Sequence, residues 1–136
     1  MKCTSFICQF SILLCIILMW SCHDTPYTQG QGLYTRHCQN CHMEDGSGLV
    51  NLIPSLTTSS YMGSASMACV LVHGIRDTIH RDSVFLVREM PSFQNLSSTE
   101  VTNIINYVNH TWHPNFMETS ILDVQNSLKE CQLIQE

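Results

Sequence analysis

The amino-acid sequence predicts an all-α domain of three to four short helices joined by long connections. Apolar residues recur at helical spacing in two segments, at about residues 28–37 and 98–112. Between these segments, glycine and proline residues punctuate the chain, which favours irregular connections. Because helices this short bury little apolar surface by themselves, something besides side chains is expected to complete the core.

The first helix is predicted over residues 28–37, where four residues occupy the i, i+3, i+4 and i+7 positions: Gly30, Leu33, Tyr34 and His37. Turn-forming residues at 44–48 then end this helical region. Residues 49–64 are expected to be irregular. A second helix is predicted over about residues 66–72, with Gly74 as the residue that terminates it.

The clearest helical signal lies nearer the C-terminus. Ser97 and Glu100 have the spacing of a capping box, in which each side chain bonds the backbone N–H of the other. An apolar stripe follows at helical spacing: Val101, Ile104, Ile105, Val108 and Trp112. Residues 120–133 are predicted to form a last, weaker helix, with three apolar residues facing inward: Ile121, Val124 and Leu128.

Residues 38–42, with the sequence CQNCH, form a C-x-x-C-H run, which is the attachment site of a c-type haem. Two thiols at this spacing, Cys38 and Cys41, can each add to a vinyl group of the porphyrin. The adjacent His42 then presents its imidazole to the iron as the proximal ligand. We therefore expect one covalent haem c, which also supplies the missing apolar volume of the core. The other interpretation, a thiol redox pair, lacks the strand–helix setting of such pairs.

The second axial position of the iron decides between electron transfer and ligand chemistry. Met90 is predicted to fill it, because Pro91 forces an extended backbone that suits a thioether projected from a loop. Its separation of 48 residues from His42 is enough for the chain to wrap around the haem. His80 is the main rival. The other methionines and histidines considered are Met43, Met62, Met67, Met117, His73, His110 and His113.

Residues 1–22 are expected to be a targeting segment that ends at Cys22. A minimal positive start precedes residues 6–20, an apolar run that is short for a transmembrane helix and suits a signal peptide. Because a small residue and then Cys22 follow this run, we predict a bacterial lipoprotein with Cys22 acylated. An uncleaved anchor and ordinary cleavage are the alternatives. Residues 23–27 form a short tether, and the domain is placed outside the cytoplasm, on the periplasmic side of a membrane or free in the periplasm.

Two of the eight cysteines, Cys69 and Cys131, have no role in the signal segment, lipid attachment or haem attachment. They can form one disulfide in an oxidising compartment. Alternatively, Cys69 can be a buried free thiol, and this second interpretation is narrowly favoured.

Together these residues resemble the class I cytochrome c family over about residues 30–112. The run at 38–42 matches the family's haem-binding run, and the acidic, glycine-rich turn at 44–48 matches the turn after it. The Met90-Pro91-Ser92-Phe93 segment is similar to the family's distal methionine loop. The resemblance implies a cytochrome c-like fold wrapped around one covalent haem, in a domain over residues 28–113. A C-terminal extension with a short helix follows over residues 114–136.

The resemblance also implies particular contacts. Gly30 and Tyr34 resemble the family's N-terminal helix, in which a small residue lets the C-terminal helix cross closely, and Tyr107 is similar to its aromatic partner. Pro54 resembles the proline whose carbonyl accepts the other ring proton of the proximal histidine. The chain departs from the family pattern at Met43, where glycine is common, at His113 and in the charged segment around His80.

The sequence therefore predicts an extracytoplasmic monohaem cytochrome c that carries one electron and is not itself an enzyme. Its expected partners are redox proteins such as a terminal oxidase, a reductase or a dehydrogenase, and the domain is expected to be monomeric. From Cys22 onward, five basic and eleven acidic side chains give a formal charge of −6, which disfavours nucleic acid as a partner. Two alternatives stay open. One is a haem-based gas sensor or small peroxidase-like enzyme with a displaceable distal site, and the other is a subunit docked permanently on a larger oxidoreductase.

Overall fold

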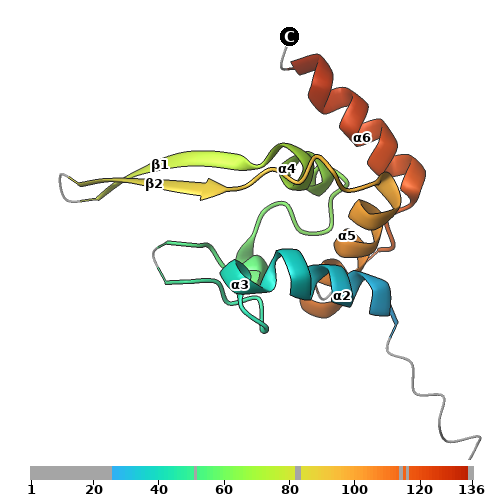
Figure 1. The fold of residues 1–136 in the computed structure, drawn as a ribbon, viewed down its shortest axis with the longest axis horizontal. Coiled ribbons are helices and arrows are strands. Elements are labelled where there is room, and N and C mark those ends of the chain that lie inside the picture. The colour runs from blue at the N-terminus through green and yellow to red at the C-terminus, as the bar shows by residue number, and fades with distance from the viewer. Residues whose placement is uncertain (1–25, 51, 82–83, 114, 116, 135–136) are drawn as a thin grey trace, which may run out of the picture.

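The computed structural model describes residues 26–50, 52–81, 84–113, 115 and 117–134. The predicted signal segment, Cys22 and most of the tether lie outside this described part of the chain. Short helices joined by loops make up most of the fold, together with one two-stranded hairpin (Figure 1). In chain order the elements are α2 (Thr28–His37), α3 (Gln39–His42), the 3₁₀ helix η1 (Leu56–Thr58), α4 (Met67–His73), β1 (Ile75–Arg81), β2 (Val84–Met90), α5 (Ser98–Trp112) and α6 (Ile121–Ile134).

Helices α2 and α5 cross closely, as the resemblance implied, and the crossing depends on Gly30. A Cβ atom at Gly30 would lie 2.6 Å from the Cβ of Tyr107 and would overlap the backbone of Asn103. The ring of Tyr34 packs on the ring of Tyr107 at a centroid distance of 5.5 Å. A side chain at this position would therefore push the two helices apart.

The predicted capping box begins α5. The Ser97 hydroxyl accepts from the Glu100 N–H at 3.3 Å, and the Glu100 carboxylate accepts from the Ser97 N–H at 2.8 Å. The apolar stripe that follows is buried, with four side chains that are at most 1 % exposed: Val101, Ile104, Ile105 and Val108. Burying such a side chain contributes about 1.5–3 kcal/mol. The core of the domain therefore forms around this face of α5.

Helix α6 is the predicted last helix, and it packs on α4 and α5 on the side of the molecule away from α2 and α3 (Figure 1). A capping box that the sequence analysis overlooked begins it: the Ser120 N–H donates to the Asp123 carboxylate, and the Asp123 N–H donates to the Ser120 hydroxyl. Val124 lies in the core at 0 % exposure. At the start of this segment, Asn106 exchanges two hydrogen bonds with the backbone of Thr119.

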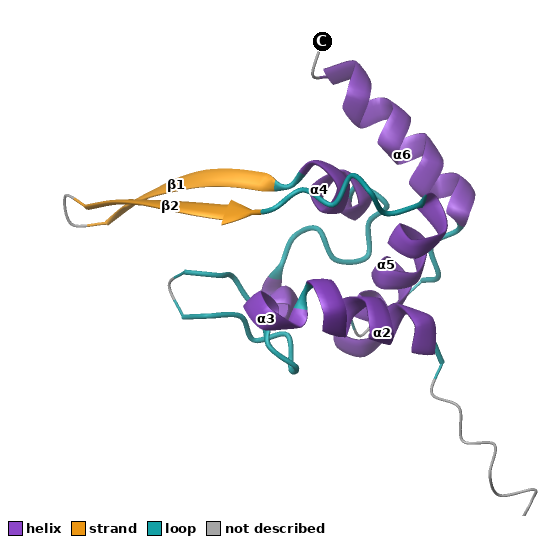
Figure 2. Ribbon diagram, in the orientation of Figure 1, coloured by secondary structure: helices purple, strands orange, loops and turns teal. Residues whose placement is uncertain are grey.

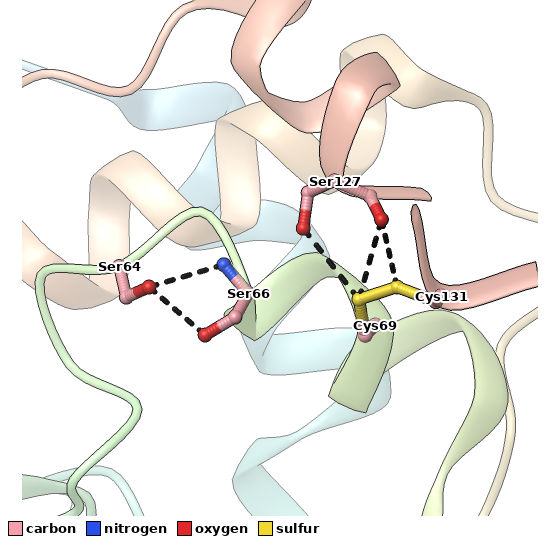
Figure 3. The surroundings of a disulfide bond; sticks show 5 residues. All are labelled: Ser64, Ser66, Cys69, Ser127 and Cys131. Carbon is pink, nitrogen blue, oxygen red and sulfur yellow. Dashed lines mark hydrogen bonds between the residues drawn. A yellow bond between two sulfur atoms is a disulfide. The ribbon is translucent and has the colours of Figure 1, made fainter. Parts of the chain in front are cut away.

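Cys69 and Cys131 form a disulfide between α4 and α6, with their Cα atoms 6.0 Å apart (Figure 3). The narrow preference for a free thiol at Cys69 was therefore wrong. The two cysteines are 62 residues apart in sequence. Only the packing of α6 against α4, which no local pattern indicates, brings the two sulfurs together.

Residues 75–90 form an antiparallel hairpin, to which the sequence analysis assigned no element (Figure 2). The register pairs Ile75 with Met90 at the base of the hairpin and Arg81 with Val84 at its far end. Charged residues obscured the strand pattern, because they occur on both strands. The hairpin brings opposite charges face to face: Arg76 stands across from Glu89, and such cross-strand pairs favour pairing. In Figure 1 the hairpin projects from the end of α4, away from α5 and α6.

Among the described helices, none combines the length and the apolar character needed to cross a membrane.

Candidate haem site

The cysteine pair lies where α2 passes into α3. The Cys38 N–H donates to the Tyr34 carbonyl at 2.8 Å, so that α2 ends at this residue, and the N–H of His42 donates to the Cys38 carbonyl at 2.9 Å. Cys38 is buried and Cys41 is exposed, and both carry free thiols in this structure. Burial, and secondly the neighbouring Cys41, raise the pKa of the Cys38 thiol to about 11. Neither sulfur takes part in a disulfide, so both can form the thioether bonds that a c-type haem requires.

A tight turn follows His42. Met43 adopts a left-handed φ of 63°, and its carbonyl accepts a hydrogen bond from the Tyr34 hydroxyl at 2.6 Å. The Gly48 N–H then donates to the His42 carbonyl at 3.1 Å, which folds the glycine-rich segment back on the histidine. Trp112 covers this turn, because a Cβ atom at Gly46 would lie 2.9 Å from the indole ring.

Two opposing effects act on the His42 imidazole. Burial is the larger and lowers its pKa, while the backbone of Pro54 acts on the ring as a hydrogen-bond partner and raises the pKa in part. The contact with Pro54 is loose, because the buried Nδ1 atom makes no well-formed hydrogen bond. The balance keeps the imidazole neutral at pH 7, the form in which histidine binds a metal. Pro54 stands beside His42, as the resemblance implied.

Met90 lies at the end of β2 and lines the same cavity as His42. Its backbone is extended, as the following Pro91 led us to expect, and it pairs with Ile75 in the hairpin. The backbone just beyond is held by α4, since the Phe93 N–H donates to the Leu71 carbonyl at 3.0 Å. The thioether of Met90 is half-buried.

A single cavity brings these residues together, and with its open mouth it encloses about 690 Å³. Pockets that bind cofactors are mostly apolar. Four of the predicted haem residues line the cavity, namely Cys38, His42, Pro54 and Met90. The rest of the lining is mostly apolar and comes from α2, η1, the loop after it, α4, β1 and α5: Tyr34, Leu56, Ser59, Tyr61, Met62, Met67, Val70, Leu71, Ile75, Ile104 and Val108.

The rival ligands fall into two groups. Met62 and Met67 line the same cavity as Met90, so the pocket holds three thioethers in all among the described residues. His80 lies on β1 opposite Phe85, and its side chain is outside the described part of the structure. His42 is the one described histidine in the lining; the other candidates outside it are Met43, Met117, His73, His110 and His113.

The residues present suit a haem by their chemistry. A flat porphyrin needs apolar walls, a pair of thiols on one turn and nitrogen and sulfur donors for its iron. The cavity has apolar walls, one of the two thiols, the neutral His42 and Met90. Cys41 is exposed at the end of the same turn, three residues after Cys38. Sequence reasoning did not identify the wall formed by residues 56–62, because this irregular segment has no periodic pattern.

Comparison with known families agrees with this chemistry. Residues 25–108, more than half of the chain, match the family model described as cytochrome c oxidase, cbb3-type, subunit III. The match includes α2, α3, the glycine-rich turn, α4, the hairpin and most of α5, and it ends before α6. No curated protein matches the chain.

Proposed function

We propose that this chain is a monohaem electron carrier with His42 and Met90 as the axial ligands of the iron. The chain belongs to the family of cytochrome c domains of cbb3-type cytochrome c oxidase subunit III. Membership of this family implies a haem-carrying electron-transfer protein with covalent haem c. It also suggests oxidases as redox partners. The ligand set and the location of the protein are our proposals.

The observation that carries the ligand set is the shared cavity of His42, Met90 and Cys38. Haem, when bound, supplies one-electron redox chemistry and needs little from the protein beyond ligands and surroundings. Cys38 and Cys41 would hold it covalently, and His42 and Met90 would supply a nitrogen and a sulfur donor. The mostly apolar walls would surround the haem with a fixed environment of low polarity. A thioether ligand favours the reduced iron and raises the potential relative to two histidines.

Pro54 tunes the proximal donor in this account. Its backbone beside the His42 ring favours a proton on Nδ1, which leaves Nε2 as the donor atom. The turn held by Tyr34, Met43 and Gly48 keeps the imidazole in one orientation. These residues orient the ligand and do not take part in electron transfer themselves.

The sensor or peroxidase-like alternative has less support. It needs an open or displaceable distal position with a histidine near the iron, and His42 is the one histidine in the described lining of the cavity. Thioether sulfurs from Met62, Met67 and Met90 are available in the cavity instead, and a thioether bound to the iron would compete with an external ligand.

Carbon monoxide binding separates the two functions. We expect the ferrous holoprotein to bind carbon monoxide slowly or not at all, and Met90→Ala to bind it readily. Met62→Ala is the matched control, because this substitution removes a thioether from the same cavity, and it should behave like the unmodified protein. Rapid binding by the unmodified protein would favour the sensor hypothesis instead.

A redox titration should give a positive potential; a strongly negative one would refute the His42/Met90 pair.

We also propose that Cys22 carries a lipid and that the domain works on the periplasmic side of a membrane. The proposal rests on the apolar run and the Cys22 that follows it. Metabolic labelling with a fatty acid should mark the full chain and leave Cys22→Ser unlabelled. A labelled Cys22→Ser chain would refute acylation at this residue.

Co-purification of the full chain with an oxidase in mild detergent would indicate a permanent subunit, and a monomer would indicate a mobile carrier.

A further inference from the structure

Helix α6 lies beyond the residues that match the family model, yet it is covalently linked to α4, which lines the haem cavity. The link is the disulfide between Cys131 of α6 and Cys69 of α4 (Figure 3). The Ser127 hydroxyl, one turn before Cys131, lies 3.5 Å from the Cys69 sulfur and can donate to it. Val124, two turns before Cys131 on the same helix, is fully buried in the core.

Helix α4 has two roles at the cavity. Three of its side chains form part of the cavity wall: Met67, Val70 and Leu71. With Met67–His73 as its bounds it has only seven residues, and a helix this short has little stability without tertiary contacts. Its position is therefore set by what it packs against, and α6 is one of those neighbours.

The end of α4 also holds the segment that carries Met90. The Leu71 carbonyl accepts from the Phe93 N–H at 3.0 Å. Gly74, which ends α4, approaches the Met90 carbonyl so closely that a Cβ atom there would overlap it, and would lie 3.0 Å from the Pro91 carbonyl carbon. Ile75 then pairs directly with Met90. A displacement of α4 therefore displaces the backbone of Met90.

We propose that the Cys69–Cys131 disulfide, which ties α6 to α4, is a positioning element for the distal methionine, acting through α4. The disulfide holds α4, and α4 holds the Met90 backbone through Leu71, Gly74 and Ile75. The proposal rests on the proposed function, in which Met90 is the distal ligand. It extends that function by assigning a role at the haem to a segment outside the family match.

A disulfide with a purely stabilising role leads to different expectations. A disulfide that only stabilises the fold does so by restricting the unfolded chain, and its removal lowers the unfolding midpoint. It leaves the native iron site unchanged well below that midpoint. Removal of a positioning disulfide changes the strength of the iron–Met90 bond in the folded protein. The reason is that the disulfide and this bond are then linked by a coupling free energy.

The test compares Cys69→Ser/Cys131→Ser with the unmodified holoprotein, both in the ferric and the ferrous states. At a temperature where circular dichroism shows both proteins folded, we expect the double variant to lose part of its near-infrared sulfur-to-iron band. We also expect its ferrous form to bind carbon monoxide at least about five-fold more tightly, the lower end of typical coupling between sites. An unchanged band and an unchanged affinity would overturn the proposal.

Asn106→Ala is the matched control, because it removes two hydrogen bonds between α5 and Thr119, just before α6, and leaves the disulfide in place. It should lower the unfolding midpoint and leave the band in place. If Asn106→Ala weakens the band as much as the double variant does, the effect is one of general stability and the proposal is wrong.

A second measurement covers failure of the double variant to mature. The assembled holoprotein is treated with a water-soluble phosphine, which reduces the disulfide to two thiols and becomes a phosphine oxide, with water supplying the oxygen and the two protons. After alkylation of the thiols, removal of the phosphine and reoxidation of the iron, the band should be weaker, and an unchanged band would again overturn the proposal. Absence of the band from the disulfide-intact protein would instead refute Met90 as ligand, and with it the premise.

Discussion

The close crossing of α2 and α5 makes a sharp prediction about two glycines of the same helix. At Gly30 an added Cβ would meet the Tyr107 Cβ at 2.6 Å and overlap the Asn103 backbone, whereas at Gly32 nothing lies within 4 Å. Alanine at either position gains about 1 kcal/mol in helix propensity over glycine. Gly32→Ala should therefore stabilise the domain by about that amount.

Gly30→Ala receives the same gain but must push two helices apart. Overpacking costs about 1–3 kcal/mol, and the upper end applies here because the obstructing atoms are backbone and a Cβ, which cannot swing away. The net effect should be about 2 kcal/mol of destabilisation, and the two variants should differ by about 3 kcal/mol. The consequence reaches the haem cavity, since α2 contributes Tyr34 and α5 contributes Ile104 to its wall.

The assay is guanidinium denaturation of the ferric holoproteins, followed by circular dichroism in the helical region. Gly32→Ala serves as the internal control for propensity, so only the difference between the variants reports the crossing. Equal stability of Gly30→Ala and Gly32→Ala would refute the close approach of α2 and α5.

Further predictions concern the turn and the helix caps. Met43→Gly should stabilise the protein by about 1 kcal/mol in the same assay, because Met43 holds a φ of 63° that favours glycine; a loss of stability would show that its half-buried side chain matters more than this strain. Ser97→Ala should cost about 1 kcal/mol through loss of the α5 cap, and an unchanged midpoint would contradict that cap. Hydrogen bonds from Ser97 lower the pKa of Glu100, and hydrogen bonds from Ser120 lower the pKa of Asp123. Both carboxylates thus stabilise the fold above their ordinary pKa range, and this stabilisation is lost as the pH falls through the lowered values. Acid titration of Asp123→Asn should show a shallower decline in stability, and an unaltered slope would count against the α6 cap.

The helices were predictable because their signals are local. The capping box at Ser97 and the stripe through Val108 lie within a few turns of each other, and both appear in α5. The C-x-x-C-H run also specifies its own chemistry, so Cys38 and His42 could be identified without knowledge of the fold.

The rest depends on packing between distant segments. The hairpin at residues 75–90 has charged residues on both strands, so its pattern is hidden until the register pairs Arg76 with Glu89. The disulfide needs α6 to lie on α4, and no pattern within either helix indicates this. The contribution of Met62 and Met67 to the cavity wall could not be predicted either. These residues and Met90 are brought to one cavity only by the folding of the chain.

The central claim is that His42 and Met90 bind the iron, and the near-infrared spectrum of the ferric holoprotein tests it most directly. We expect a weak sulfur-to-iron charge-transfer band that is present in the unmodified protein, retained in Met62→Ala and Met67→Leu, and lost in Met90→Ala. Retention of the band in Met90→Ala, or its absence from the unmodified protein, would contradict the account.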